Sequence, residues 1–158
     1  MSRFRKVAGT VVYGAQLGPY YRIGGNIAYQ PPFLGIVQTD GSRSPLRGSR
    51  VAMILTTRDR MNIHKQMLEI SETADSTETE WAAVSHGLEF ALQKGETMIG
   101  IENDNLAVVG ALITGPGKSQ KEYVRYYSDR ILRFSKLSLW TGIRWIPREI
   151  NLADDLFR

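Results

Sequence analysis

The stretch STETEWAAVSHGLEFALQKG, residues 76–95, predicts a helix around which the rest of the chain is organised. Apolar or small side chains recur in it at three- and four-residue spacing, which is the pattern of one buried helix face. These side chains are Trp81, Ala82, Val84, Leu88, Ala91 and Leu92. Ser76 or Thr77 is suited to cap the start of this helix, and Gly95 is suited to end it.

One carboxylate, Glu80, stands in the first turn of this helix, directly before the apolar run. We expect it near the buried face, where a carboxylate needs a partner and a cation is the natural one. The alternative is a capping box, in which Glu80 bonds back to the backbone of Thr77. This stretch alone leaves both interpretations open.

The composition is that of one soluble globular domain, with 158 residues of which 42% are hydrophobic. The absence of cysteine excludes a disulfide framework, a thiolate metal site and thiol catalysis. No apolar run approaches the length of a membrane span, and the N-terminal residues lack the apolar segment of a signal peptide, so we expect a cytoplasmic protein. The net charge of +4 suits a polyanionic partner without demanding one.

Residues 1–33 are predicted to form an extension, because they are rich in glycine and tyrosine and end at Pro31 and Pro32. Within them YRIGGNIAY, residues 21–29, has two β-prone runs around two glycines, which indicates a β-hairpin. The tyrosines and basic side chains suit a nucleic-acid surface, and packing on the domain edge is the alternative. The basic residues are Arg3, Arg5, Lys6 and Arg22.

Residues 34–158 are predicted to form the main domain, because strand patterns alternate there with helical ones. This order favours an α/β fold with a five-stranded mixed sheet flanked by helices. The strands are expected at 33–42, 50–57, 62–70, 96–104 and 138–148, and further helices at 105–113, 118–137 and, barely one turn long, within 151–158.

Asp40 and Asp104 each stand at the end of a predicted strand, and Asp154 follows shortly after the last one. If the strands before Asp40 and Asp104 are parallel neighbours, both carboxylates enter the same space, and the first helix turn brings Glu80 to that edge. Four carboxylates together repel one another unless divalent cations lie between them. Hard oxygen ligands select magnesium or manganese over zinc.

Four motifs together resemble ribonuclease H of the type 1 family, over roughly residues 34–158. They are TDGS at 39–42, TEWAAVSHGLEFAL at 79–92, NDNLAVVGAL at 103–112 and IPREINLADDL at 146–156. The resemblance implies an RNase H-like fold and a metal-dependent endoribonuclease that hydrolyses the RNA strand of RNA–DNA hybrids. It also implies Asp40, Glu80, Asp104 and Asp154 as catalytic ligands of two Mg²⁺ ions, with Mn²⁺ as a possible substitute.

The implied mechanism uses one cation to generate hydroxide and the other to stabilise the leaving 3′ oxygen, which gives 5′-phosphate and 3′-hydroxyl products. Selection for RNA requires contacts to 2′-hydroxyl groups. The candidate contacts are the backbone near Gly41 and Ser42, with Thr77, Thr79 and Asn105 beside them. We expect a monomer that uses no organic cofactor.

The chain departs from the family pattern at its C-terminal end. NLADDL offers two adjacent aspartates: the family pattern Ala-Asp-x-Leu selects Asp154, whereas counting four residues from Asn151 selects Asp155, and we favour Asp154. Many members carry a histidine in the preceding loop; here Glu149 is a candidate for its role, or is simply an exposed partner of Arg148.

The 50 residues from Asp104 to Asp154 are too few for the extra basic helix with which some members grip the hybrid. Basic residues of the helix at 118–137 are candidates for phosphate contacts, and a solvated helix face is the alternative. They are Lys118, Lys121, Arg125, Arg133 and Lys136. Two other functions fit the same sequence: a noncatalytic nucleic-acid-binding module of this fold, and the ribonuclease module of a reverse-transcribing element.

Overall fold

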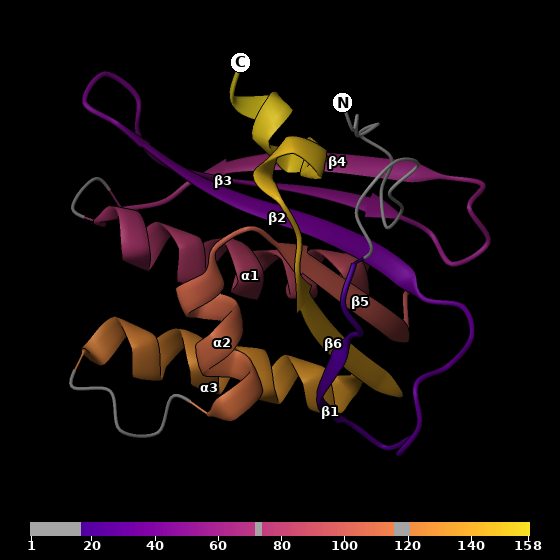
Figure 1. The fold of residues 1–158 in the computed structure, drawn as a ribbon. Coiled ribbons are helices and arrows are strands. Elements are labelled where there is room, and N and C mark those ends of the chain that lie inside the picture. The colour runs from indigo at the N-terminus through magenta and orange to yellow at the C-terminus, as the bar shows by residue number, and fades with distance from the viewer. Residues whose placement is uncertain (1–16, 72–73, 116–120) are drawn as a thin grey trace.

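The computed structural model describes residues 17–71, 74–115 and 121–158, and these contain one six-stranded mixed sheet. The strand order across the sheet is β1-β6-β5-β2-β3-β4 (Figure 1). The strands are β1 (Tyr21–Gly25), β2 (Gly35–Ser44), β3 (Gly48–Thr56), β4 (Ile63–Glu69), β5 (Met98–Asn103) and β6 (Trp140–Trp145). The three central strands β2, β5 and β6 are parallel, and the others pair antiparallel at the two sides.

All five strands predicted within the main domain are present, and β1 is the sixth. The hairpin predicted around Gly24 and Gly25 is wrong for the described residues, because β1 pairs with β6 instead of with the run after it. That run leaves the sheet after Gly25, whose φ is +92°, and the N–H groups of Asn26 and Ile27 both donate to the carbonyl of Leu139. The edge of β6 that faces away from β5 is thus paired by β1 and the two residues that follow it.

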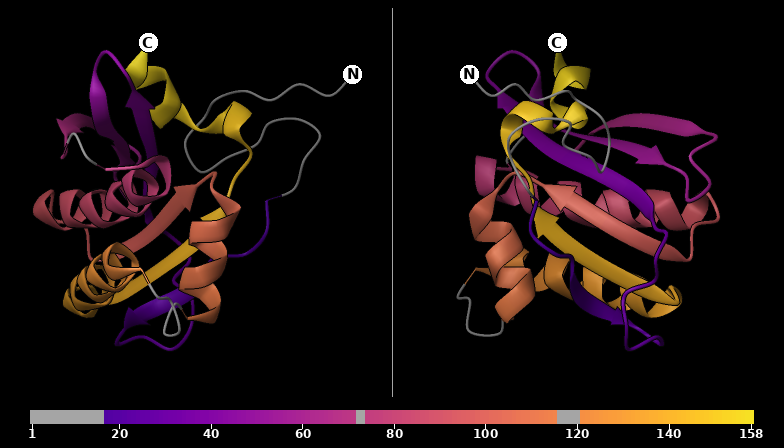
Figure 2. Two further views of the ribbon diagram at one scale, coloured as in Figure 1. Left: turned by 90° about the vertical axis from the view of Figure 1, so that its left-hand side faces the viewer. Right: turned by 45° about the vertical axis from the view of Figure 1, so that its right-hand side comes forward.

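Helices α1 (Ser76–Gln93) and α3 (Glu122–Leu137) lie side by side against one face of the sheet (Figure 2). The buried core lies between them and the strands, and α2 (Leu106–Thr114) contributes to the same core. Its members include Met53, Leu55, Trp81, Leu88, Phe90, Ile99, Ile101, Ile131 and Ile143. No helix of the described residues is both long and apolar enough to span a membrane.

The start of α1 differs from the prediction. Asp75, rather than Ser76 or Thr77, caps the helix, and its carboxylate accepts a hydrogen bond from the N–H of Glu78 at 2.8 Å. Because Asp75 serves as the cap, the capping-box interpretation of Glu80 is wrong, and the carboxylate of Glu80 is directed to another partner. Gly95, with a φ of +88°, follows the helix as expected.

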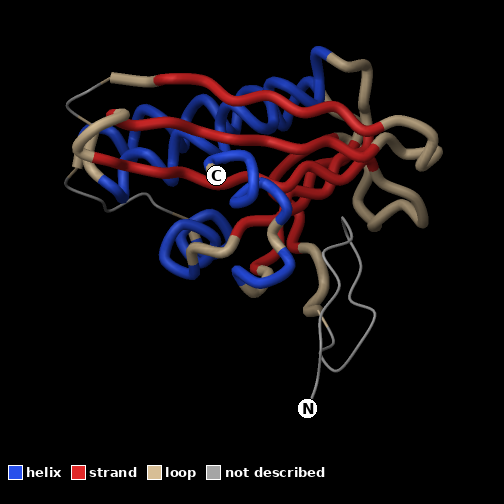
Figure 3. Tube along the Cα trace, turned by 90° about the horizontal axis from the view of Figure 1, so that it is seen from above, coloured by secondary structure: helices blue, strands red, loops and turns tan. Residues whose placement is uncertain are grey.

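The opposite face of the sheet is partly covered by the C-terminal segment. Two short 3₁₀ turns, η1 (Arg148–Ile150) and η2 (Leu152–Phe157), follow β6, and η2 packs over β2 and β3. Figure 3, seen from above, shows these turns lying over the strands. The expected terminal helix is therefore a 3₁₀ turn, and it carries Asp154.

Candidate active site

Three carboxylates from different elements converge at one edge of the sheet. Asp40 lies in β2, Asp104 follows β5 directly and Glu80 lies on α1, and their oxygen atoms come within 4.8 Å of one another. The reason is the parallel pairing of β2 with β5, in which Thr39 stands opposite Asn103, so that both aspartates follow at the same level. The predicted convergence of Asp40 and Asp104 is present, but Asp40 lies inside β2 and not at its end, because β2 continues to Ser44 in its ladder with β3.

Gly41 allows Glu80 to come close to the strand. Its N–H donates to Oε1 of Glu80 at 2.6 Å and to Oδ1 of Asp40 at 3.0 Å. A Cβ atom at position 41 would lie 2.6 Å from that Glu80 oxygen and 2.9 Å from the carbonyl carbon of Thr79. The N–H of Gly41, a predicted substrate contact, is thus engaged with two carboxylates.

Asp154 completes the acidic group from η2. It is buried, and it lines a cavity of about 270 Å³ together with Asp40, Glu80 and Asp104. Asp40 is hydrogen-bonded to it. Two arginines form ion pairs with the carboxylate of Asp154: Arg158 at 3.0 Å and Arg148 at 3.6 Å. Asp155, the alternative ligand, is exposed and is not among the residues that line this cavity.

Burial and mutual repulsion raise the pKa values of Asp40, Glu80 and Asp104. Burial first, and then the charge of Asp104, raises the pKa of Asp40 to about 9. The same two causes raise the pKa of Glu80 to about 7, although the Gly41 N–H opposes them. The pKa of Asp104 is raised as well, chiefly by burial. A buried, all-oxygen donor set of this kind fits a hard divalent cation, which would replace the protons bound there.

Two asparagines hold the acidic residues in place. The Nδ2 of Asn151 donates to the carbonyl of Thr39 at 3.0 Å and to Oδ2 of Asp104 at 3.4 Å. Asn105 caps α2 by accepting from the N–H of Val108 at 3.0 Å, and its side chain is also hydrogen-bonded to Glu80. The side chain of Asn105, which the sequence predicted as a substrate contact, is therefore already hydrogen-bonded to α2 and to Glu80.

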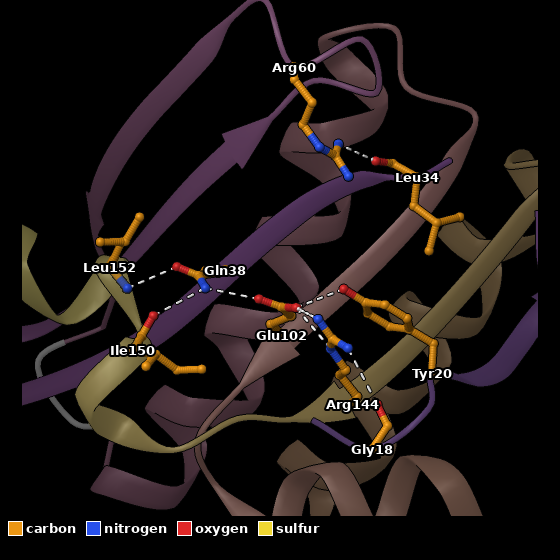
Figure 4. A network of polar contacts seen from close by, with 9 residues as sticks. All are labelled: Gly18, Tyr20, Leu34, Gln38, Arg60, Glu102, Arg144, Ile150 and Leu152. Carbon is orange, nitrogen blue, oxygen red and sulfur yellow. Dashed lines mark hydrogen bonds and ion pairs between the residues drawn. The ribbon is translucent and has the colours of Figure 1, made fainter. Parts of the chain in front are cut away.

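A buried polar network, which the sequence patterns did not reveal, supports the segment that carries Asp154 (Figure 4). Glu102 of β5 is fully buried and accepts from Tyr20 at 2.7 Å, from Gln38 at 2.9 Å and from Arg144. The carboxamide of Gln38 in turn accepts from the N–H of Leu152 at 2.9 Å. Tyr20, β2, β5, β6 and η2 are thereby joined through a single carboxylate.

The remaining residues predicted to contact the substrate differ in how accessible their side chains are. Ser42 lines the acidic cavity and Thr77 is exposed on the first turn of α1, but Thr79 is buried and its hydroxyl donates to the carbonyl of Asp75 at 2.7 Å. Lys121 and Arg125 are exposed at the start of α3, as are Arg133 and Lys136 farther along it, whereas Lys118 lies outside the described residues.

Neither histidine of the chain lines the acidic cavity. His86, whose pKa is lowered chiefly by burial, lies 3.8 Å from Glu89 on α1. Glu149 is exposed on η1 next to Arg148, which does line the cavity. A proton-transfer role for Glu149 stays a prediction.

Comparisons with known proteins agree with this geometry. A family described as "Reverse transcriptase-like" matches residues 38–157. RNase H1 from the halophilic archaeon Halobacterium salinarum NRC-1 aligns with a TM-score of 0.65 and 21% identity, over 77% of this chain and 92% of that one. No curated protein sequence matches the chain.

Two similar structures were solved with RNA/DNA hybrid. LC11-RNase H1, isolated from compost by a metagenomic approach, aligns with a TM-score of 0.64 and 22% identity, over 77% of this chain and 92% of that one. The foamy viral protease-reverse transcriptase aligns with a TM-score of 0.61 and 17% identity, over 84% of this chain and 21% of that one. At these identities the likeness shows a shared fold.

Proposed function

Because the chain belongs to the reverse transcriptase-like family and has the RNase H fold, we propose that it is a divalent-metal-dependent endoribonuclease acting on the RNA strand of RNA–DNA hybrids. The main observation in support of this proposal is that carboxylate oxygens of Asp40, Glu80 and Asp104 lie within 4.8 Å of one another, with Asp154 lining the same cavity. The two similar proteins solved with RNA/DNA hybrid support the choice of substrate.

In the proposed reaction the four carboxylates hold two Mg²⁺ ions, with Mn²⁺ as a substitute. When bound, such ions supply a hydroxide nucleophile at neutral pH and stabilise the charge on the leaving 3′ oxygen. The products would carry 5′-phosphate and 3′-hydroxyl groups. The protein holds the carboxylates in position: the Gly41 N–H donates to Glu80, Asn151 donates to Asp104, and η2 carries Asp154.

Selection for RNA would come from groups at the rim of the acidic cavity. Ser42 lines that cavity and is half-buried, so its hydroxyl is available to a substrate 2′-hydroxyl, which DNA lacks. Arg148 lines the same cavity with its side chain 75% exposed, so it is placed to contact a phosphate.

The experiment is a cleavage assay with the purified chain on an end-labelled RNA–DNA hybrid, double-stranded RNA and double-stranded DNA, each with Mg²⁺ or with a chelator. The proposal predicts metal-dependent cleavage of the hybrid RNA alone, abolished by Asp104→Asn and Asp154→Asn. Asp155→Asn is the matched control and should remain active, because Asp155 does not line the cavity. Binding of the hybrid without cleavage in any metal would instead identify a noncatalytic module.

A further inference from the structure

Arg50 is a buried cation that pairs with no carboxylate of the residues that the structure describes. It lies in β3 and is 7% exposed. Its guanidinium lies 5.2 Å from the centre of the Phe157 ring, and its Nη1 lies 3.7 Å from the sulfur of Met67. Its Nε has no hydrogen-bond partner, and no carboxylate of the described residues pairs with it.

This arginine lies on the same face of the sheet as the acidic site. Asp40 stands opposite Ala52 in the β2–β3 ladder, and Ser42 stands opposite Arg50 two residues farther along. Because alternate residues of a strand share a face, Asp40, Ser42 and Arg50 are all directed to the side that η2 covers. Ser42 therefore stands between the catalytic carboxylates and Arg50.

A cavity of about 780 Å³ lies beside Arg50, along the turn between β2 and β3. Its lining includes three arginines, two serines and one exposed carboxylate: Arg43, Arg47, Arg50, Ser44, Ser49 and Glu69. Arg43 also lines the acidic cavity, so the two cavities share a wall. Glu69 stands opposite Arg50 in the β3–β4 ladder but does not form an ion pair with it among the described residues.

Burying an unpaired guanidinium opposes folding, since the charge loses its hydration without gaining a counter-ion. The planar donor fork of arginine matches the oxygen atoms of a phosphate group. We propose that this cavity is a phosphate site, in which Arg50, assisted by Arg47 at the turn, holds a backbone phosphate of the nucleic acid. The inference rests on the proposed function, because the scissile phosphate would then lie in the neighbouring acidic cavity.

The test measures hybrid binding by fluorescence anisotropy at several NaCl concentrations, in the non-cleaving Asp104→Asn background. Arg50→Met should weaken binding about tenfold and lower the slope of log affinity against log salt by about one. Arg58→Met is the matched control, because Arg58 is an exposed arginine beyond the other end of β3, and it should leave the slope unchanged. Glu69→Gln should strengthen binding, since it removes the carboxylate from the cavity.

Thermal unfolding separates a binding role from a structural one. Methionine at position 50 can pack on Phe157 and Met67 without a charge, so Arg50→Met should unfold at the same or a higher temperature than the parent. Inorganic phosphate should raise the unfolding temperature of the parent but not of Arg50→Met if a free anion also enters the site. If only the hybrid responds to the substitution, the site recognises the phosphate within a nucleic acid.

The proposal is overturned if Arg50→Met lowers the unfolding temperature while its salt slope equals that of Arg58→Met, because Arg50 would then be a packing residue. It is also overturned if neither the hybrid, single-stranded RNA nor phosphate distinguishes Arg50→Met from the parent. An intact chain that binds hybrid through Arg50 but never cleaves it would refute the proposed function alone. One that cleaves hybrid without any effect of Arg50→Met would refute the phosphate site alone.

Discussion

Gln38 and Glu102 stand opposite one another on the parallel strands β2 and β5, and the Nε2 of Gln38 donates to Oε1 of Glu102 at 2.9 Å. The same carboxamide accepts from the N–H of Leu152, the first residue of η2. Two buried polar side chains thus connect the centre of the sheet to the turn that presents Asp154. The position of the last acidic residue depends on this connection.

Gln38→Leu should therefore lower both stability and activity. The substitution leaves the buried Leu152 N–H without its acceptor and removes the hydrogen bond that Gln38 donates to Glu102, which costs about 2–4 kcal/mol of unfolding free energy. Urea denaturation measures this loss, and hybrid cleavage should fall because Asp154 is less well held. Gln93→Leu, at the exposed end of α1, is the control and should change the unfolding free energy by less than about 0.5 kcal/mol.

Gly41→Ala should abolish most of the activity. The added Cβ would meet Glu80 and the backbone of Thr79, so α1 and β2 must separate at the acidic site. A displacement of about 1 Å at catalytic groups costs roughly a hundredfold in rate. Gly110→Ala in α2, where a Cβ meets nothing within 4 Å, is the control and should keep full activity. Equal rates for the two variants would show that the close approach of Glu80 is not needed.

The acidic site should make metal-free stability fall as pH rises. Asp40, with a pKa of about 9, and Glu80, with a pKa of about 7, hold protons in the folded chain that the unfolded chain releases near pH 4. The stability that these two carboxyl groups contribute is fully present below pH 4. It is lost as pH rises to about 9, because the folded state binds more protons than the unfolded state throughout this window. Thermal unfolding in chelator, measured from pH 5 to pH 9, checks this expectation.

Divalent cations should reverse that loss, because they replace the protons at the carboxylates. Mn²⁺ should raise the unfolding temperature more at pH 8 than at pH 5, and Asp104→Asn should respond less. A metal-free unfolding temperature that climbs from pH 5 to pH 8, or an equal response to Mn²⁺ at both pH values, would contradict the account of the site.

Much of the fold could be predicted because its signals are local. The spacing of apolar residues in 76–95 indicates the buried face of α1, and the short apolar runs indicate strands such as β2 and β5. The convergence of Asp40 with Asp104 follows from strand ends, since parallel neighbours bring such residues to one level. These inferences need no knowledge of distant contacts.

Features that depend on distant partners could not be predicted in the same way. The pairing of β1 with β6 requires the free edge of a strand 115 or more residues away, while the local glycines suggested a hairpin. The buried Glu102 looks like an ordinary polar residue in its strand, and only Tyr20, Gln38 and Arg144 reveal its role. Likewise, the sequence favours Asp154 over Asp155 through the family pattern, but only the placement of η2 over the sheet shows that Asp154 lines the acidic cavity and Asp155 does not.

If the acidic group at the sheet edge binds divalent metal, anomalous diffraction from crystals grown with Mn²⁺ near pH 8 will locate the ion. We expect an anomalous peak within bonding distance of carboxylate oxygens of Asp40, Glu80 and Asp104, and no such peak in Asp104→Asn crystals. Well-ordered crystals in which Mn²⁺ is bound elsewhere, while these three carboxylates contact only one another, would contradict it.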